Sequence, residues 1–195
     1  MDTANEPAAE EVAWIHRIGK GDKAALEQLY QRYASRIFRF VIRMMKDEAK
    51  AEELVNDVMM EIWKSAASFE GRSSPSTWIL GIARFRTLNA VRGKKLDTVE
   101  LSQAPEAVDE REDASAAKSH EQLRALMRQA IARLSDEHRE VVELTFFHDC
   151  SYKEIADILQ CPENTVKTRM YHAKAKLKPW LTNLGLSETE VGGVT

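Results

Sequence analysis

The chain has 195 residues, of which 44% are hydrophobic and 30% are charged, with a formal net charge of −3. This balance is typical of a folded globular protein and excludes disorder over most of the chain. No apolar run reaches the roughly 20 residues that span a bilayer, and the acidic start lacks the basic and apolar regions of a secretory signal. The sequence therefore predicts a cytoplasmic protein without membrane insertion of its own.

The small net charge hides a strong segregation of charge along the sequence. Residues 76–95 carry five basic and no acidic residues, and residues 167–178 carry another five basic and no acidic residues. Between them, residues 97–113 carry seven acidic residues and a single arginine. Two basic segments separated by an acidic one indicate two DNA contacts on one chain.

The chain has only two cysteines, Cys150 and Cys161, without CxxC spacing. A disulfide framework and a self-contained zinc site are both disfavoured, and core packing is the preferred role of the two thiols. No metal and no cofactor is predicted.

The first half of the sequence is patterned as a series of helices. A short helix ends at Ile18, before a Gly-Lys-Gly stop, and Asp22 can cap a long helix with apolar residues at steps of three and four. Asp47 opens the next helix. Residues 70–75 form a loop by composition, and residues 76–92 form an amphipathic helix.

The second half resumes this pattern after a break. Residues 93–118 lack apolar periodicity, which indicates a flexible linker. Helices are then predicted around residues 123–134 and at residues 136–147, 152–159 and 162–181. The predicted fold class is all-α, with two small helical domains at 12–95 and 119–184, a flexible acidic linker at 96–118 and a frayed tail at 185–195.

The sharpest local pattern is a helix-turn-helix at residues 151–175. Ser151 and Glu154 form a capping box, and Pro162 suits the first turn of the second helix. Burial of Val166, Met170 and Ala173 would leave an opposite face able to enter the major groove of DNA. That face contains Asn164, Lys167, Thr168, Tyr171, His172 and Ala175, flanked by Arg169, Lys174 and Lys176 as phosphate contacts. A plain helical hairpin with a solvated basic face is the alternative.

Two further surfaces lie in the first half of the chain. The helix after Asp47 sets Glu53, Asn56, Asp57 and Met60 on one outer face, which in isolation reads as an ordinary solvated surface. The helix after residue 75 combines arginines with aromatic residues, a combination suited to single-stranded DNA. Trp78 lies on its apolar stripe and is equally compatible with the core.

In the order and separation of its motifs, the chain resembles an extracytoplasmic-function sigma factor, the minimal two-domain group of bacterial sigma factors. The matching segments are Gly21-Asp22 with Leu29 and Tyr30, residues 51–58, residues 76–84, residues 134–141, and the helix-turn-helix through Leu177. The resemblance covers about residues 12–184. It implies a protein without enzymatic activity that binds RNA polymerase core and promoter DNA and is controlled by an anti-sigma factor.

The resemblance also implies roles for individual residues. Core-polymerase binding falls on Glu53, Asn56, Asp57 and Met60. Recognition and melting of the minus-ten element, with a flipped base, falls on Phe69, Arg72, Trp78, Arg84, Phe85, Arg86, Asn89 and Arg92. Recognition of the minus-thirty-five element falls on Asn164, Lys167, Thr168, Arg169, Tyr171, His172 and Lys174.

The sequence departs from the family at several positions. Asn56-Asp57 stand where the family often has Gln-Glu, a chemically close pair. Phe85 and Asn89 stand where the family often has Asn and Asp, which affects the expected details of promoter melting. Gln160 replaces a frequent turn glycine, at a cost of about 1 kcal/mol if the backbone there is left-handed.

Two other protein classes fit parts of the pattern. One is a sigma-like interaction protein that sequesters an anti-sigma factor, although such a protein has no need of a groove-reading helix. The other is a one-component helix-turn-helix regulator, which should show a ligand pocket or a dimerisation helix. Enzymatic activity is disfavoured because the five histidines are scattered and no nucleophile, phosphate loop or metal spacing stands out.

Overall fold

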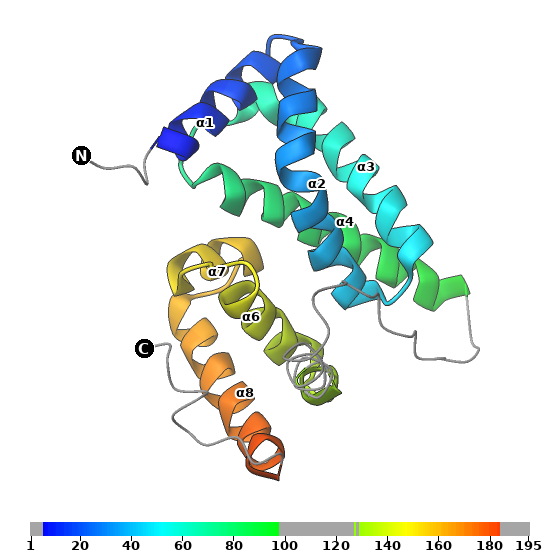
Figure 1. The fold of residues 1–195 in the computed structure, drawn as a ribbon, viewed down its shortest axis with the longest axis vertical. Helices are drawn as coiled ribbons and strands as arrows, with labels where there is room; N and C mark the ends of the chain where they lie inside the picture. Colours follow the sequence, from blue (N-terminus) through cyan, green and yellow to red (C-terminus); the bar gives the residue numbers. More distant parts are fainter. Residues whose placement is uncertain (1–5, 98–126, 128, 184–195) are drawn as a thin grey trace, which may run out of the picture. The chain divides into compact units, whose positions relative to one another are not determined.

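The computed structural model describes residues 6–97, 127 and 129–183, and every regular element in these ranges is a helix (Figure 1). The chain divides into two compact units, which are described separately. The predicted all-α class with two helical parts is confirmed. No helix in the described ranges is long and apolar enough to cross a membrane.

The first unit contains four α-helices and one 3-10 turn among its described residues. These are α1 (Glu6–Ile18), α2 (Lys23–Met45), α3 (Glu48–Ser65), η1 (Ala66–Ser68) and α4 (Pro75–Asp97). Helix α2 packs against α1, α3 and α4, and α3 also packs against α4. Their shared core is formed by fully buried side chains that include Ile15, Leu29, Ile37, Phe40, Ile62 and Ile79.

Local capping sets the helix boundaries of this unit. The Asp22 carboxylate accepts hydrogen bonds from the backbone N–H groups of Ala24 and Ala25, and that of Asp47 accepts one from Lys50. These bonds satisfy donors that have no partner inside a helix. Asp22 also pairs with Arg17 at 2.8 Å, and the hydrogen bond from Arg17 lowers the pKa of the Asp22 carboxyl. Both predicted caps are confirmed.

The end of α1 lies very close to η1. A Cβ atom on Gly19 would stand 2.9 Å from the Cα atom of Ala67, a distance that backbone atoms cannot accommodate. Glycine at this position therefore has a packing role in addition to ending α1. It allows the α1 terminus to pack directly on the segment that follows α3.

Helix α4 is longer than the sequence indicated. The sequence predicts a helix that ends at residue 92, but the helix continues through Gly93 to Asp97, so the predicted helix end is wrong. A single glycine lowers helix stability by about 1 kcal/mol relative to alanine without ending the helix, and the lysines that follow are good helix formers. The remainder of the predicted linker, most of the helix predicted around 123–134, and the tail at 185–195 lie outside the described residues.

The second unit contains a helical segment at 129–132 followed by α6 (Asp136–Phe146), α7 (Tyr152–Leu159) and α8 (Glu163–Asn183). Helix α6 packs along α8. The core of the unit includes Ile131, Val141, Leu144, Ile155, Val166 and Met170. His148 and Cys150 are also buried, in agreement with the packing role expected for Cys150, whereas Cys161 is only half-buried.

Helices α7 and α8 form the predicted helix-turn-helix. The Ser151 backbone N–H donates to Glu154 Oε2 at 2.9 Å, and the Glu154 N–H donates to Ser151 Oγ at 3.3 Å, so the capping box is confirmed. Gln160 in the turn has φ 53°, the left-handed region. Its side chain donates to the Asp157 carbonyl at 2.5 Å, which offsets part of the backbone strain.

We expect Gln160→Gly to raise the free energy of unfolding of the second unit by about 0.5–1 kcal/mol, because glycine adopts this backbone conformation without a steric penalty. Urea unfolding followed by circular dichroism measures the change. Gln160→Ala serves as the control, since it removes the side-chain hydrogen bond but keeps the Cβ atom. A glycine variant no more stable than the alanine variant would contradict the strain argument.

Candidate nucleic-acid and polymerase interfaces

Helix α8 presents one buried face and one polar, exposed face. Val166, Met170 and Ala173 are buried against the unit core. The opposite side, here called the reading face, consists of the exposed residues Asn164, Lys167, Thr168, Tyr171 and His172. The predicted division of α8 into two faces is therefore confirmed. Tyr171 is 71% exposed, a high value for an aromatic side chain that makes no contribution to the core.

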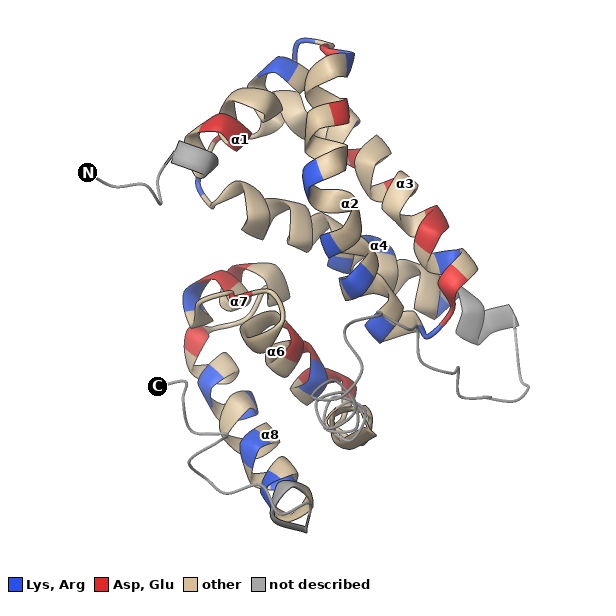
Figure 2. Cartoon of the chain, in the orientation of Figure 1, with Lys and Arg blue, Asp and Glu red and all other residues tan. Residues whose placement is uncertain are grey.

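Local contacts hold the side chains of the reading face in place. Lys167 Nζ lies 2.7 Å from Glu163 Oε1 one turn earlier, and Thr168 Oγ1 donates to the Asn164 carbonyl at 2.9 Å. The Tyr171 and His172 rings meet edge to face with centroids 5.5 Å apart. After Glu163, all charged residues of α8 are basic, while acidic residues gather on α6 and α7 (Figure 2). The helix thus offers hydrogen-bonding groups and positive charge on one surface.

Arg169, which the sequence predicts as a flanking phosphate contact, points toward α6 instead of toward solvent. Its side chain is only 22% exposed, and its Nη2 atom lies 3.1 Å from Glu137 Oε1 on α6. The other flanking residues, Lys174 and Lys176, are both exposed. The sequence did not indicate the pairing of Arg169, because Glu137 is distant in the chain and belongs to a different helix.

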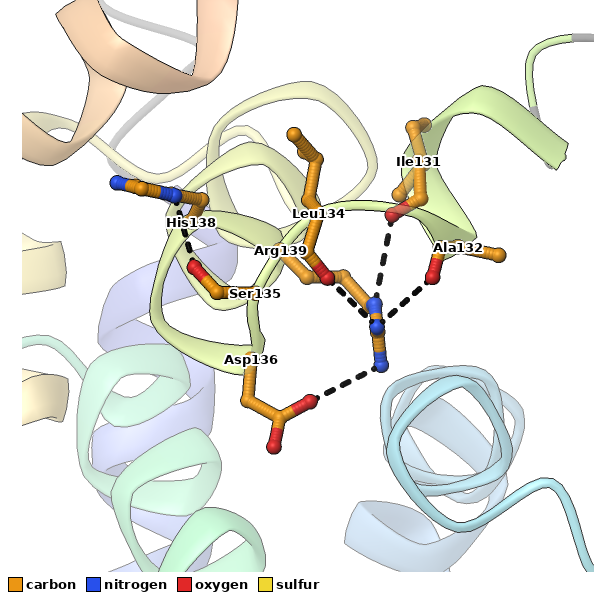
Figure 3. A network of polar contacts seen from close by, with 7 residues as sticks. All are labelled: Ile131, Ala132, Leu134, Ser135, Asp136, His138 and Arg139. Carbon is orange, nitrogen blue, oxygen red and sulfur yellow. Dashed lines mark hydrogen bonds and ion pairs between the residues drawn. The ribbon is translucent and has the colours of Figure 1, made fainter. Parts of the chain in front are cut away.

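The turn that leads into α6 is organised by Arg139 (Figure 3). Its guanidinium donates to the carbonyls of Ala132 at 3.1 Å and Leu134 at 2.9 Å, with a longer bond to Ile131 at 3.4 Å. The Ile131 carbonyl also accepts the backbone N–H of Leu134 at 3.1 Å, so Arg139 adds side-chain donors to the turn that ends the helical segment at 129–132. Arg139 also lies 3.3 Å from Asp136. One side chain therefore caps the preceding helix and fixes where α6 begins.

We expect Arg139→Met to lower the free energy of unfolding of the second unit by about 2–3 kcal/mol, because hydrogen bonds from a charged donor contribute about 1.5–3 kcal/mol each and methionine keeps only the aliphatic packing. Thermal or urea unfolding measures the loss. Arg139→Lys retains the charge but reaches fewer carbonyls, so about half of the loss should return. Wild-type stability of the methionine variant would rule out this capping role.

In the first unit, α3 carries the surface here called the acidic face, which consists of Glu53, Asn56, Asp57 and Met60. All four residues are exposed, while Leu54, Val58 and Ile62 on the other side of the helix are buried. Lys50 forms an ion pair with Glu53, and the hydrogen bond to Glu53 raises the pKa of the Lys50 ammonium. The acidic face is thus a solvent-facing surface with an apolar methionine at one end.

The loop before α4 and the helix itself place the predicted minus-ten residues in two different environments. Phe85 is 62% exposed, and Arg72, Asn89 and Arg92 are also exposed. Phe69, in contrast, is buried, and its ring contacts that of Trp78 in a tilted arrangement with centroids 4.9 Å apart. A direct contact between Phe69 and DNA disagrees with this burial. In the structure, Phe69 packs against the Trp78 ring and helps to hold it in position.

Arg86 also differs from the expectation of a free phosphate contact. Its guanidinium forms an ion pair with Glu61 on α3, and both side chains are about two-thirds buried. Arg84, on the same helix, is half-buried. Arg86 thereby links the helix of the acidic face to α4. No sequence pattern indicates this link, because charges on separate helices can be paired only after the helices are packed.

Both halves of the chain match family models. The Sigma-70 region 2 model matches residues 29–96, which include most of α2, α3 and α4, and the Sigma-70 region 4 model matches residues 124–177, which include the helix-turn-helix. The ECF RNA polymerase sigma factor RpoE of Cereibacter sphaeroides is 31% identical over 159 residues, covering 80% of this chain and 86% of the relative. The chain belongs to the ECF sigma factors. The family resemblance inferred from the sequence is confirmed.

Other relatives and structures agree with this family membership. SigK of Mycobacterium tuberculosis is 26% identical over 170 residues, covering 85% of this ECF sigma factor and 90% of the relative. The solved sigma factor RpoE of Bartonella quintana, in complex with the anti-sigma factor NepR, has a TM-score of 0.64 at 26% identity, covering 80% of this chain and 96% of that one. CnrH, in complex with the cytosolic domain of CnrY, has a TM-score of 0.66 at 19% identity, covering 89% and 98%, and supports the fold.

Family membership establishes the general function. Sigma factors are transcription initiation factors rather than enzymes, and they direct RNA polymerase to promoters. The two matched regions coincide with the helices that carry the acidic face, the α4 residues and the reading face. Within the residues that the two family models match, the ECF sigma factor therefore has exposed residues on α3, α4 and α8.

Proposed function

We propose that this ECF sigma factor divides its function among these three surfaces. The acidic face of α3 binds RNA polymerase core, the loop before α4 together with α4 recognises and opens the minus-ten element, and the reading face of α8 recognises the minus-thirty-five element. The observation that carries the proposal is the composition of α8. Its buried side is fully used by the core of the unit, so its exposed polar and aromatic side is available to a duplex.

The acidic face suits a basic partner surface on the polymerase. Glu53 and Asp57 supply negative charge, Asn56 supplies a donor and an acceptor, and Met60 supplies an exposed apolar contact. Complementary charge accelerates association, and the apolar centre of an interface contributes much of its affinity.

For the minus-ten element, the structure favours a smaller set of direct contacts than the sequence did. Phe85 offers a stacking surface, and Arg72, Asn89 and Arg92 offer exposed polar groups near single-stranded DNA. Trp78, supported by Phe69, is half-buried and belongs to the wall of this surface. Arg84 and Arg86 contribute positive charge that attracts the DNA backbone, although Arg86 is paired with Glu61.

The two compact units of the chain support the proposal that each unit binds a different promoter element. We assign polymerase binding and minus-ten recognition to residues 12–95 and minus-thirty-five recognition to residues 119–184, with a linker at 96–118 and a tail at 185–195. Each DNA contact alone is weak. Polymerase would fix their separation, so that binding at one element raises the effective concentration of the other contact.

Control by an anti-sigma factor in the cytoplasm completes the proposal. Bartonella quintana RpoE, which this chain resembles in structure, was solved with its anti-sigma factor. A partner that covered the acidic face and the reading face would prevent both polymerase binding and promoter binding. The exposure of both faces in the unbound chain is consistent with such masking.

Assembly with polymerase tests the proposed division. The fluorescently labelled full-length chain should elute with RNA polymerase core in size-exclusion chromatography, and an excess of an unlabelled sigma factor should displace it. If the labelled chain elutes alone at concentrations at which other sigma factors assemble, the polymerase-binding role of the acidic face is wrong.

A further inference from the structure

Next to the reading face, α8 carries a second row of basic residues that turns toward α6. Arg169, His172 and Lys176 are spaced by three and four residues and therefore lie on one side of the helix. We call these three residues the basic strip. Helix α6 packs along α8, and its first turn lies against this strip. His172 belongs to both the strip and the reading face, so the two surfaces are continuous.

The contacts between α6 and the basic strip are specific. Glu137 Oε1 lies 3.1 Å from Arg169 Nη2, and the His138 ring stands 6.2 Å from the His172 ring. His138 Nδ1 is also within 2.8 Å of Ser135 Oγ. Burial lowers the pKa of His138, with smaller lowering effects from Lys176, His172 and Arg169, whereas Glu137 raises it. Glu137 thus places a carboxylate against the basic strip, in contact with Arg169.

Arg169 and Glu137 differ in solvent exposure, and the difference shows which of the two side chains is packed against the protein. Arg169 is 22% exposed, whereas Glu137 is 67% exposed. The guanidinium is therefore drawn back against the protein, and the carboxylate stands toward solvent at the border of the reading face. A DNA phosphate that approached Arg169 would also meet the negative charge of Glu137.

We propose that Glu137 is a specificity-determining residue of this sigma factor, which acts by restraining Arg169 from indiscriminate contacts with phosphate. The inference rests on the proposed role of the reading face in binding duplex DNA. Phosphate contacts strengthen binding to every sequence equally, whereas base contacts discriminate among sequences. A carboxylate that withholds one phosphate contact weakens non-specific binding and leaves base readout to the reading face.

The direct test compares Glu137→Gln with Asp136→Asn in the full-length chain. Both substitutions remove one negative charge from the first turn of α6, but Asp136 is 86% exposed and faces Arg139 instead of the basic strip. The probe is a labelled duplex of scrambled sequence, and its affinity is measured by fluorescence anisotropy at several salt concentrations. This probe requires no knowledge of the promoter.

For Glu137→Gln, we expect the affinity for the scrambled duplex to rise about fivefold and the slope of log K against log salt to steepen by about 0.9, the value of one added phosphate contact. Asp136→Asn should leave the slope unchanged. In an Arg169→Gln background the effect of Glu137→Gln should disappear, because the two residues act as a pair. From a random duplex pool, the Glu137→Gln variant should select a less restricted sequence motif than the wild-type chain.

The outcomes separate this inference from the proposed function. If Glu137→Gln and Asp136→Asn change affinity and slope equally, or if the effect persists without Arg169, the role of Glu137 is overturned. Lys167→Ala provides the independent check of the reading face. If Lys167→Ala leaves binding to the scrambled duplex unchanged and Glu137→Gln does too, α8 does not bind DNA and the proposed function of this face fails with the inference.

Discussion

Asp57→Arg should reduce the affinity for RNA polymerase core by about a hundredfold. Asp57 is exposed at the centre of the acidic face, with Leu54 and Val58 buried behind it. An arginine there would place positive charge against the basic partner surface that the acidic face implies, and like charges placed together across an interface cost several kcal/mol. Because the side chain faces solvent in the free protein, the fold should be unaffected. Titration of labelled chain with core polymerase measures the change.

Glu27→Arg is the matched control for this substitution. Glu27 is an exposed residue of α2 in the same unit, and the substitution changes the net charge by the same amount. It should lower the affinity for polymerase by less than about threefold, since Glu27 lies on α2, outside the acidic face of α3, and salt screens exposed charges that are not in contact. Equal losses from the two substitutions would show that net charge matters and the acidic face does not.

Tyr171→Ala should lower the affinity of the assembled polymerase complex for its promoter by about tenfold while leaving core binding intact. The ring is largely exposed and its removal creates no cavity, so a loss of affinity would report a contact with DNA. Discrimination by one base contact is typically about 1–3 kcal/mol. Electrophoretic mobility shift with a promoter selected from a random pool measures the effect.

Tyr171→Phe shows which part of the side chain is used. If the ring contacts a base by stacking or by apolar contact, phenylalanine should retain most of the affinity, whereas a hydrogen bond from the hydroxyl would be lost. Neither variant should change the elution of the chain with core polymerase. A reduced affinity for core in either variant would contradict the separation of the reading face from the acidic face.

The features that the sequence predicted well are those governed by local chemistry. Asp22, Asp47 and Ser151 cap helices through bonds to residues two or three positions away, so their roles can be read from short segments. The two faces of α8 follow from helical periodicity alone. The predicted bounds of α7 agree with the structure for the same reason.

The features that the sequence could not provide depend on packing between helices. Phe69 was expected at a DNA surface, but it is buried beneath Trp78, a contact set by how the loop folds onto α4. Arg86 and Arg169 were expected to be free for phosphate, but each is paired with a glutamate from another helix. Only the packed arrangement shows which arginines are already engaged and which residues, such as Glu137, hold them.

Run-off transcription by the reconstituted enzyme tests the central claim most directly. Core polymerase and this chain would be incubated with a library of genomic promoter fragments, and transcripts would be sequenced from their first nucleotide. We predict transcripts that begin at fixed positions downstream of one shared pair of sequence elements and that disappear with Asp57→Arg. Transcripts no different from those of core polymerase alone would contradict the account.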